Sequence, residues 1–224
     1  MVGDRCSVKD PQVNDRPVIG VLALQGAFAA HAEVLARLGV DVIEVRRPDQ
    51  LGELDGIVLP GGESTAMSNL LKTSGLFETL GERLRNGLPV FGTCAGMILL
   101  AEEILDGRDD QVSFDVLPIG VRRNGYGRQI DSFETEIAIK DLDSSFHAVF
   151  IRAPKITRLD PSVKVLAEHE GTPVLVRHGS AMAASFHPEL GHDSRIHAMF
   201  VELVRNQHDS TDRASRDHVS LNRG

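Results

Sequence analysis

VFGTCAGMIL, residues 90–99, places a cysteine between two glycines where an apolar run changes from strand to helix. A strand that turns abruptly into a helix needs small neighbours, and Gly92, Ala95 and Gly96 provide them. Such a turn projects its central side chain from the carboxyl edge of the sheet, and the helix N-terminus behind it favours a thiolate. Free cysteine is also among the most buried residue types. Cys94 taken alone is therefore either a packed side chain or a nucleophile.

Strands and helices alternate on both sides of this turn through the first hundred residues. The apolar run at 18–24 is typical of a strand buried on both faces, and residues 27–39 repeat their apolar side chains at helical spacing. The same patterns predict further strands at 41–45, 56–60 and 88–92, and helices at 64–71, 76–85 and 95–104. This alternation predicts an α/β fold of three layers, α/β/α, around a sheet that is parallel at its centre.

The second half of the chain is richer in short β-type segments separated by polar or Gly/Pro turns. We expect antiparallel strands there, which would make the sheet a mixed one, at residues 132–139, 147–151, 163–169, 172–178 and 181–186. Asp193 is placed to cap a last helix with an apolar stripe. The domain prediction is a disordered N-terminal tail at 1–16, one folded domain at 17–205 and a disordered C-terminal tail at 206–224.

Composition excludes several classes of function. The formal net charge of −8 argues against a nucleic-acid binder, and no apolar run is long enough to span a membrane or to act as a signal peptide. With two cysteines and no expected disulfide, we predict a cytoplasmic protein. The remaining histidines show no metal-ligand spacing, so neither a metal nor a cofactor is expected.

A cysteine nucleophile needs a base, and AASFHPEL at 183–190 offers one. In an extended chain, residues two apart point to the same side, so the Glu189 carboxylate can reach the His187 imidazole. A carboxylate on one ring nitrogen fixes the tautomer and leaves the other nitrogen to face a thiol. A His-Pro-Glu triplet alone is weak, and its value lies in combination with Cys94.

VLPGGESTAM at 58–67 places two glycines after a buried strand. Backbone N–H groups at such a turn can form an oxyanion hole for a developing negative charge. The alternative is an ordinary strand-to-helix turn in which Glu63 or Ser64 caps the helix. The stretch is not a P-loop, because it lacks the Gly-Lys-Ser/Thr sequence.

Together these stretches resemble class I (triad) glutamine amidotransferases, which have a flavodoxin-like core. The narrower strings look like the glutaminase subunit of the ribose-5-phosphate-dependent pyridoxal 5'-phosphate synthase, over about residues 18–204. These strings are LQGAF at 24, LPGGEST at 59, FGTCAGMI at 91, RNGYGRQIDSFE at 123, FIRAP at 150 and SFHPEL at 185. One departure is Gly125-Tyr126, where family members often have Ser-Phe.

The resemblance implies hydrolysis of L-glutamine to glutamate and ammonia, with Cys94 as nucleophile, His187 as proton shuttle and Glu189 as its orienting group. It assigns the oxyanion hole to the backbone N–H groups of Gly62 and Ala95. It assigns substrate binding to residues on three segments: Gly62, Glu63, Ser64, Arg123, Ile151 and Arg152.

The resemblance also implies a partner, a (β/α)8-barrel synthase subunit that forms a dodecamer and carries one glutaminase on each barrel. Gln25 and Gly26 match a family position at that interface, and docking completes the oxyanion hole in the family. Two alternatives stay open at this point. One is a glutaminase subunit that serves another synthase, such as that of the histidine pathway, and the other is an idle regulatory partner of the same fold.

Overall fold

The computed structural model describes residues 16–108, 110–123 and 132–207. The tails predicted at 1–16 and 206–224 lie almost wholly outside these ranges, as do Cys6 and the Gly125-Tyr126 departure. Within the described residues, no helix has the length and apolar character that crossing a bilayer requires.

A seven-stranded mixed sheet forms the middle layer, in the order β10-β11-β12-β4-β3-β1-β2. The five strands β2, β1, β3, β4 and β12 run parallel, while β11 and β10 add antiparallel to one edge. The bounds are β1 Val18–Leu22, β2 Asp41–Val45, β3 Gly56–Leu59, β4 Val90–Thr93, β10 Lys164–His169, β11 Thr172–His178 and β12 Ala181–Ala184. The predicted sheet, mixed and parallel at its centre, is confirmed.

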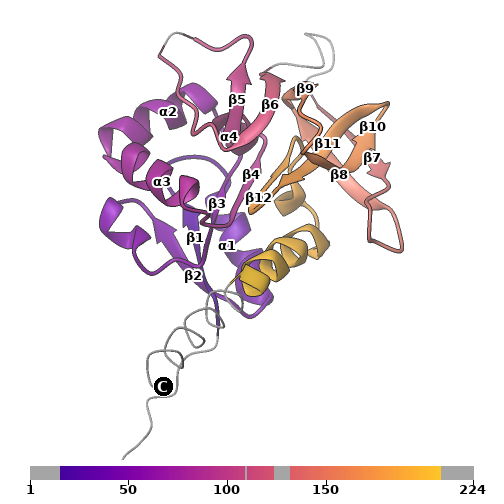
Figure 1. Cartoon of the computed structure of the whole chain (residues 1–224). Coiled ribbons are helices and arrows are strands. Elements are labelled where there is room, and N and C mark those ends of the chain that lie inside the picture. The colour runs from indigo at the N-terminus through magenta and orange to yellow at the C-terminus, as the bar shows by residue number, and fades with distance from the viewer. Residues whose placement is uncertain (1–15, 109, 124–131, 208–224) are drawn as a thin grey trace, which may run out of the picture.

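Helices cover both faces of this sheet, and strand alternation explains why both faces are apolar. In β3, Ile57 and Leu59 face one core cluster, whereas Val58 between them faces the other. Helices α2 and α3 pack on the first cluster, and α1 and the helix at residues 195–207 pack on the second (Figure 1). The bounds are α1 Phe28–Arg37, α2 Ser64–Thr73, α3 Leu76–Arg85 and α4 Ala95–Leu100, with 3-10 turns η1 Pro48–Leu51 and η2 Pro188–Leu190. The three-layer arrangement is therefore as predicted.

The helix predicted at 95–104 is wrong in its second half. It ends at Leu100, and Ala101–Ile104 forms strand β5, parallel to β6 (Leu117–Arg122). The sequence AEEI has good helix propensity, but pairing with β6 overrides that weak local preference. A third strand, β9 (Lys155–Leu159), pairs antiparallel with β6 and completes a small sheet that we did not predict.

The direction of the strand predicted at 181–186 also needs correction. It is shorter, as β12, and it runs antiparallel to β11 but parallel to β4. All four of its residues are buried, as expected of a central strand. The chain therefore returns to the parallel part of the sheet directly before His187. The first strand likewise ends at Leu22 rather than at residue 24.

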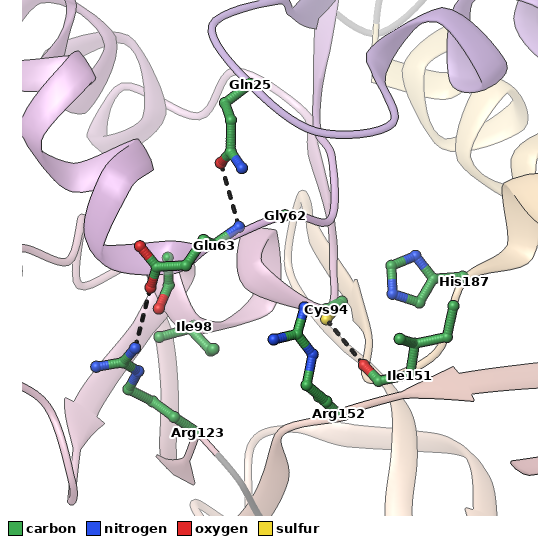
Figure 2. Close-up of a pocket in the computed structure, with 10 residues that line it drawn as sticks. Gln25, Gly62, Glu63, Cys94, Ile98, Arg123, Ile151, Arg152 and His187 are labelled. Carbon is green, nitrogen blue, oxygen red and sulfur yellow. Dashed lines mark hydrogen bonds and ion pairs between the residues drawn. The ribbon is translucent and has the colours of Figure 1, made fainter. Parts of the chain in front are cut away.

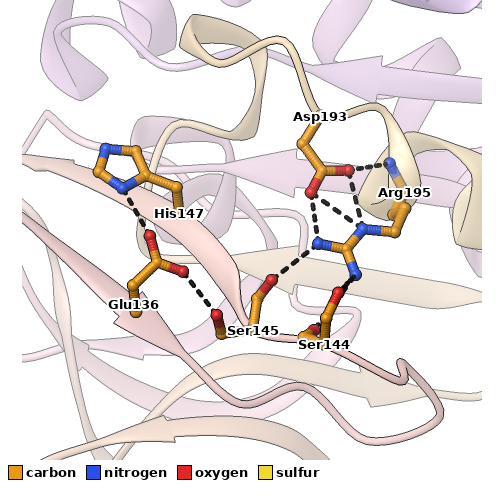
Figure 3. A network of polar contacts seen from close by, with 6 residues as sticks. All are labelled: Glu136, Ser144, Ser145, His147, Asp193 and Arg195. Atoms are coloured by element: carbon orange, nitrogen blue, oxygen red, sulfur yellow. Dashed lines mark hydrogen bonds and ion pairs between the residues drawn. The ribbon is translucent and has the colours of Figure 1, made fainter.

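The hairpin of β7 (Ser132–Ile137) and β8 (Phe146–Ile151) packs beside the start of the last helix, and Arg195 joins them. Its guanidinium donates to both carboxylate oxygens of Asp193 and to the carbonyl oxygens of Ser144 and Ser145 (Figure 3). Asp193 also accepts the backbone N–H of Arg195, the first residue of the helix, at 3.0 Å. It does so from the position before the N-cap, which is Ser194, because the Ser194 carbonyl accepts the Ala198 N–H. These contacts hold the segment after β12 against β8.

Candidate active site

Cys94 occupies a sharp turn between β4 and α4. Its backbone has φ 49° and ψ −104°, a conformation that side-chain-bearing residues rarely adopt and that persists only where the surroundings impose it. The Cys94 N–H donates to the carbonyl of Ala184 in β12 at 2.8 Å, and its Sγ lies 3.9 Å from the carbonyl oxygen of Ile151. The thiol thus sits at the carboxyl ends of β4 and β12, and the residue is only 7 % exposed.

Two glycines allow this turn to lie against the sheet. A Cβ added at Gly96 would stand 2.0 Å from the carbonyl oxygen of Leu59, and one at Gly92 would stand 2.6 Å from the carbonyl group of Gly96. Both are backbone contacts, so no side-chain rotation can relieve them. The predicted need for small residues around Cys94 is therefore a need for close approach of α4 to β3.

His187 and Glu189 follow β12 and meet as the i, i+2 spacing predicted. His187 Nδ1 lies 2.7 Å from Glu189 Oε1, and both residues are buried. The backbone N–H of His187 donates to the carbonyl of Val149 in β8 at 2.9 Å. A Cβ added at Gly61 would meet His187 Cε1 at 2.4 Å and Cys94 Cβ at 3.4 Å, so the imidazole and the cysteine flank the same glycine.

The electrostatics of this pair favour a charged imidazole. Burial alone would lower the pKa of His187, but its interactions with Cys94 and Glu189 outweigh burial and raise the pKa to about 10. Burial would also raise the pKa of Glu189, but the hydrogen bond from His187 and the charges of His31 and His187 keep that pKa below its ordinary value. Glu189 is therefore a carboxylate at neutral pH.

A pocket of about 330 Å³ opens in front of Cys94 (Figure 2). Ten residues line it, and nine of them are residues that the sequence analysis singled out; the exception is Ile98. They are Gln25, Gly62, Glu63, Ser64, Cys94, Ile98, Arg123, Ile151, Arg152 and His187. Ala95, Gly26 and Glu189 are not in the lining, and Glu189 lies behind His187.

Glu63 both caps a helix and faces the pocket. Its carboxylate accepts the backbone N–H groups of Thr65 and Ala66, at 3.0 and 2.7 Å, at the start of α2. Arg123 Nη2 lies 3.1 Å from the same carboxylate. Burial acts to raise the pKa of Glu63, but these hydrogen bonds and Arg123 lower it below its ordinary value. The capping alternative is therefore correct for Glu63, although the residue also lines the pocket.

Gln25 and Gly26 lie directly on the segment that carries Gly62. Gln25 Oε1 accepts the backbone N–H of Glu63 at 3.1 Å, and the Ala27 N–H donates to the Gly61 carbonyl at 3.3 Å. Gly26 has φ 89°, and a Cβ there would stand 1.8 Å from the Gly61 oxygen. The loop at Gln25 and Gly26 is therefore in direct contact with the Gly61–Glu63 backbone.

Sequence reasoning gave no role to a group of polar side chains buried behind Glu189. His31 Nδ1 lies 2.9 Å from His197 Nε2, and His31 Nε2 lies 3.1 Å from Thr93 Oγ1 and 3.3 Å from Glu189 Oε2. His31 is on α1 and His197 on the last helix, and both are fully buried. In the sequence, each of these histidines lies on the apolar face of a predicted helix, which indicates burial. Their contact with each other depends on the fold, which brings the two faces together.

These two histidines predict acid sensitivity. Burial lowers the pKa of His31 to about 4 and that of His197 to about 3, whereas both titrate near 6.5 when unfolded. Below pH 6.5 the unfolded chain takes up protons that the native state does not, so stability falls as the pH falls. We expect the free energy of unfolding to drop by about 1.6 kcal/mol per histidine between pH 6.5 and 5. Urea unfolding at pH 7, 6 and 5 measures this.

The control for this prediction is His147, an exposed histidine whose pKa the hydrogen bonds of Glu136 and Glu134 raise. Its native state stays protonated throughout this range while the unfolded state takes up its proton near pH 6.5, so His147→Gln does not lessen the fall in stability between pH 6.5 and 5. His187, with its raised pKa, likewise contributes nothing to the fall in stability in that range. His197→Phe removes about half of the slope, and a wild-type stability that is flat from pH 6.5 to 5 contradicts the prediction.

No group of three or more histidine, cysteine, aspartate or glutamate side chains suited to a metal ion occurs among the residues that the structure describes. The pocket and the residue behind it offer a buried thiol, an imidazole paired with a carboxylate, and backbone N–H groups. That set is suited to acyl transfer through a covalent intermediate.

Residues 21–206 match the SNO glutamine amidotransferase family. Relatives named pyridoxal 5'-phosphate synthase subunit PdxT are 54% identical over 189 residues in Mycobacteroides abscessus and 49% identical over 187 residues in Thermosipho africanus. Each alignment covers 84% of this chain and 98% of the relative.

A solved structure described as a glutamine amidotransferase is 46% identical, with a TM-score of 0.79, and covers 83% of this chain and 98% of its own. A glutamine amidotransferase from Thermotoga maritima, 16% identical with a TM-score of 0.54 over 92% of this chain and 86% of its own, shares the fold.

Proposed function

The chain belongs to the SNO glutamine amidotransferase family, and on that premise we propose that it hydrolyses L-glutamine to L-glutamate and ammonia through Cys94, His187 and Glu189. The observation that carries the proposal is the 2.7 Å contact between His187 and Glu189 beside a cysteine held at φ 49°. A carboxylate-oriented imidazole next to a thiol at a strained turn is the arrangement that activates a cysteine nucleophile.

The proposed reaction has two stages. Cys94 Sγ, as thiolate, attacks the side-chain amide carbon of glutamine, and the charged His187 gives its proton to the departing nitrogen, which leaves as ammonia. A water molecule then attacks the thioester while His187 takes its proton. The thioester bond breaks, and glutamate and the thiolate–imidazolium pair are restored. The raised pKa of His187, about 10, supports an imidazolium as the resting form.

The backbone N–H groups of Gly62 and Ala95 are our proposed oxyanion donors. Ala95 is the first residue of α4, and N–H groups in the first turn of a helix have no acceptor within that helix. The substrate's α-amino and α-carboxylate groups would then contact the segment Gly62–Ser64 together with Arg123, Ile151 and Arg152. All six of these residues line the pocket, and the arginines supply positive charge opposite a carboxylate.

The names of the relatives support a partner for the ammonia. We propose that this chain delivers it to a synthase subunit that makes pyridoxal 5'-phosphate, as part of vitamin B6 biosynthesis in the cytoplasm. We further propose that the synthase is a (β/α)8 barrel in a dodecameric core decorated with copies of this chain. The contact of Gln25 with Glu63 supports the loop at Gln25 and Gly26 as the place where docking would reach the oxyanion segment.

Neither alternative from the sequence gains support. The idle regulatory partner predicts a missing triad member, whereas Cys94 and His187 line one pocket and Glu189 contacts His187 from behind it. A synthase of another pathway predicts relatives with other names, whereas the relatives at about 50% identity are named as subunits of pyridoxal 5'-phosphate synthase.

The deciding experiment is a glutamine-dependent assay of pyridoxal phosphate formation with the chain and a co-expressed synthase subunit. We expect product from glutamine only when the chain is present, with glutamate released in equal amount to the ammonia used. Ammonium salt should replace both glutamine and the chain. Ammonium-driven synthesis that glutamine plus the chain cannot reproduce contradicts the proposal.

A further inference from the structure

The second oxygen of the Glu189 carboxylate faces a buried histidine rather than solvent. Glu189 is 5 % exposed, and its Oε1 is occupied by His187. Oε2 makes no formed hydrogen bond within the described residues, and its ion-pair contact is with His31 Nε2 at 3.3 Å. A donor near its second oxygen further stabilises the charged form of a buried carboxylate, and catalytic hydrogen bonds are often long before substrate binds.

The direction of the hydrogen bonds around His31 can be assigned from both ends of the group. If His31 carried its proton on Nδ1, the lone pair of Nε2 would face the negative Oε2 of Glu189 at 3.3 Å, which is repulsive. In that arrangement His197 Nε2 would accept, so the proton of His197 would sit on Nδ1. His197 Nδ1 is buried with no partner among the described residues, and a buried N–H without an acceptor is costly.

The opposite arrangement removes both problems. His197 Nε2–H donates to His31 Nδ1 at 2.9 Å, and His31 Nε2–H donates to Thr93 Oγ1 at 3.1 Å with Glu189 Oε2 3.3 Å from the same nitrogen. Only a lone pair is then left unpaired on His197 Nδ1. The N–H donors then all point in the same direction, from His197 on the last helix to His31 on α1 and from His31 toward the Glu189 carboxylate that orients His187.

Charge is consistent with this assignment. Burial lowers the pKa of His31 to about 4 and that of His197 to about 3, so both are neutral at physiological pH. The charged and titratable groups that act on this cluster are Cys94 and His187 on one side of Glu189, and Arg37, through its charge on His197, on the other. A neutral N–H donor stabilises the Glu189 carboxylate without placing a positive charge beside it. The carboxylate therefore still attracts the His187 imidazolium.

We propose that His31 is a positioning residue for the glutaminase reaction: its Nε2–H holds Glu189 Oε2, and His197 fixes the proton on that nitrogen. A role of His31 in catalysis rests on the proposed function of the chain. Loss of the donor would leave a buried carboxylate with one oxygen unpaired, so Glu189 would take up a proton at higher pH. The Glu189 carboxylate, and with it the orientation of the His187 imidazolium beside the Cys94 thiolate, would then persist only at higher pH.

The test compares His31→Met, which fills the space without a donor, with His31→Gln, whose amide N–H can replace Nε2–H. In the complex with the synthase, His31→Met should lower kcat about ten- to hundredfold with little change in the KM for glutamine, as loss of a hydrogen bond to a charged group predicts. The acid limb of the kcat/KM profile should move up by about one pH unit. His31→Gln should recover most of both effects, and His178→Met, remote from the triad, should change neither.

A second readout needs no glutaminase activity. The pH dependence of Cys94 alkylation by iodoacetamide in the full chain reports formation of the thiolate–imidazolium pair. Its acid limb should also move up in His31→Met and return in His31→Gln. Failure of wild-type glutamate release with the synthase would refute the proposed function, whereas the alkylation profile would still decide the role of His31.

Two outcomes overturn the inference: His31→Met with the wild-type acid limb, or His31→Gln as impaired as His31→Met, which would mean that His31 only packs. If His31→Met does not fold, His197→Phe carries the test. It removes the donor to His31 Nδ1 and should shift the acid limb in the same direction by a smaller amount. An unshifted His197→Phe profile overturns the assigned direction of the hydrogen bonds.

Discussion

Cys94→Ala should reduce glutamine hydrolysis at least about 10⁴-fold while leaving the fold intact. Every bond change in the proposed reaction passes through the thiolate, and removing a nucleophile from a triad leaves only the small rate that binding and the oxyanion donors supply. The side chain is small, and besides its interaction with His187 its Sγ makes one weak contact, with the Ile151 carbonyl at 3.9 Å, so the fold should be retained. The measurement is glutamate release in the presence of the synthase, with far-UV circular dichroism to verify folding.

The chain offers a matched control for this prediction, because it has only one other cysteine, Cys6. Cys6→Ala should retain full activity, and a glutamine-analogue electrophile should label wild-type protein at Cys94 far faster than at Cys6. Hydrolysis by Cys94→Ala within tenfold of wild type would rule out the covalent mechanism. Equal labelling of the two cysteines would contradict an activated thiol.

The parts of the fold that sequence predicted well are those with local causes. The strand, cysteine turn and helix at 90–99 needed glycines at fixed spacing. The contact between His187 and Glu189 was predicted from an extended chain, and it occurs instead where His187 leads into the 3-10 turn η2, which carries Glu189. Family resemblance, rather than spacing, predicted a place in the site for Arg123, Ile151 and Arg152. The backbone of Arg152 has φ 43°, which no pattern in the sequence indicated.

The parts that were missed depend on contacts between distant segments. The local sequence at Ala101–Ile104 predicts a helix, and only its pairing with β6 makes it a strand. Whether β12 is parallel or antiparallel depends on its neighbour in the sheet. It is antiparallel to β11 and parallel to β4, and neither pairing is visible in its own sequence. His31 and His197 are separated by 166 positions, so their contact behind Glu189 could not be seen in either local sequence.

Gly96→Ala should destabilise the protein by about 3 kcal/mol or more, because overpacking against backbone cannot be relieved by a rotamer change. The added Cβ would stand 2.0 Å from the carbonyl oxygen of Leu59, which lies at the end of a central strand buried on both faces. Helix α4 would have to move away from β3 and take the Cys94 turn with it. Urea unfolding followed by circular dichroism measures the loss.

Gly52→Ala is the matched control for Gly96→Ala. Gly52 has φ −59° and ψ −38°, and a Cβ there meets nothing within 4 Å, so alanine should be neutral or stabilise by up to about 1 kcal/mol. The comparison separates two roles for Gly96, packing of α4 and direct contact with the substrate. If Gly96→Ala keeps wild-type stability but loses glutamine hydrolysis, the glycine serves the substrate directly. The 2.0 Å contact instead places its role in packing, because the nucleophile can hold its strained turn only if α4 lies directly on β3.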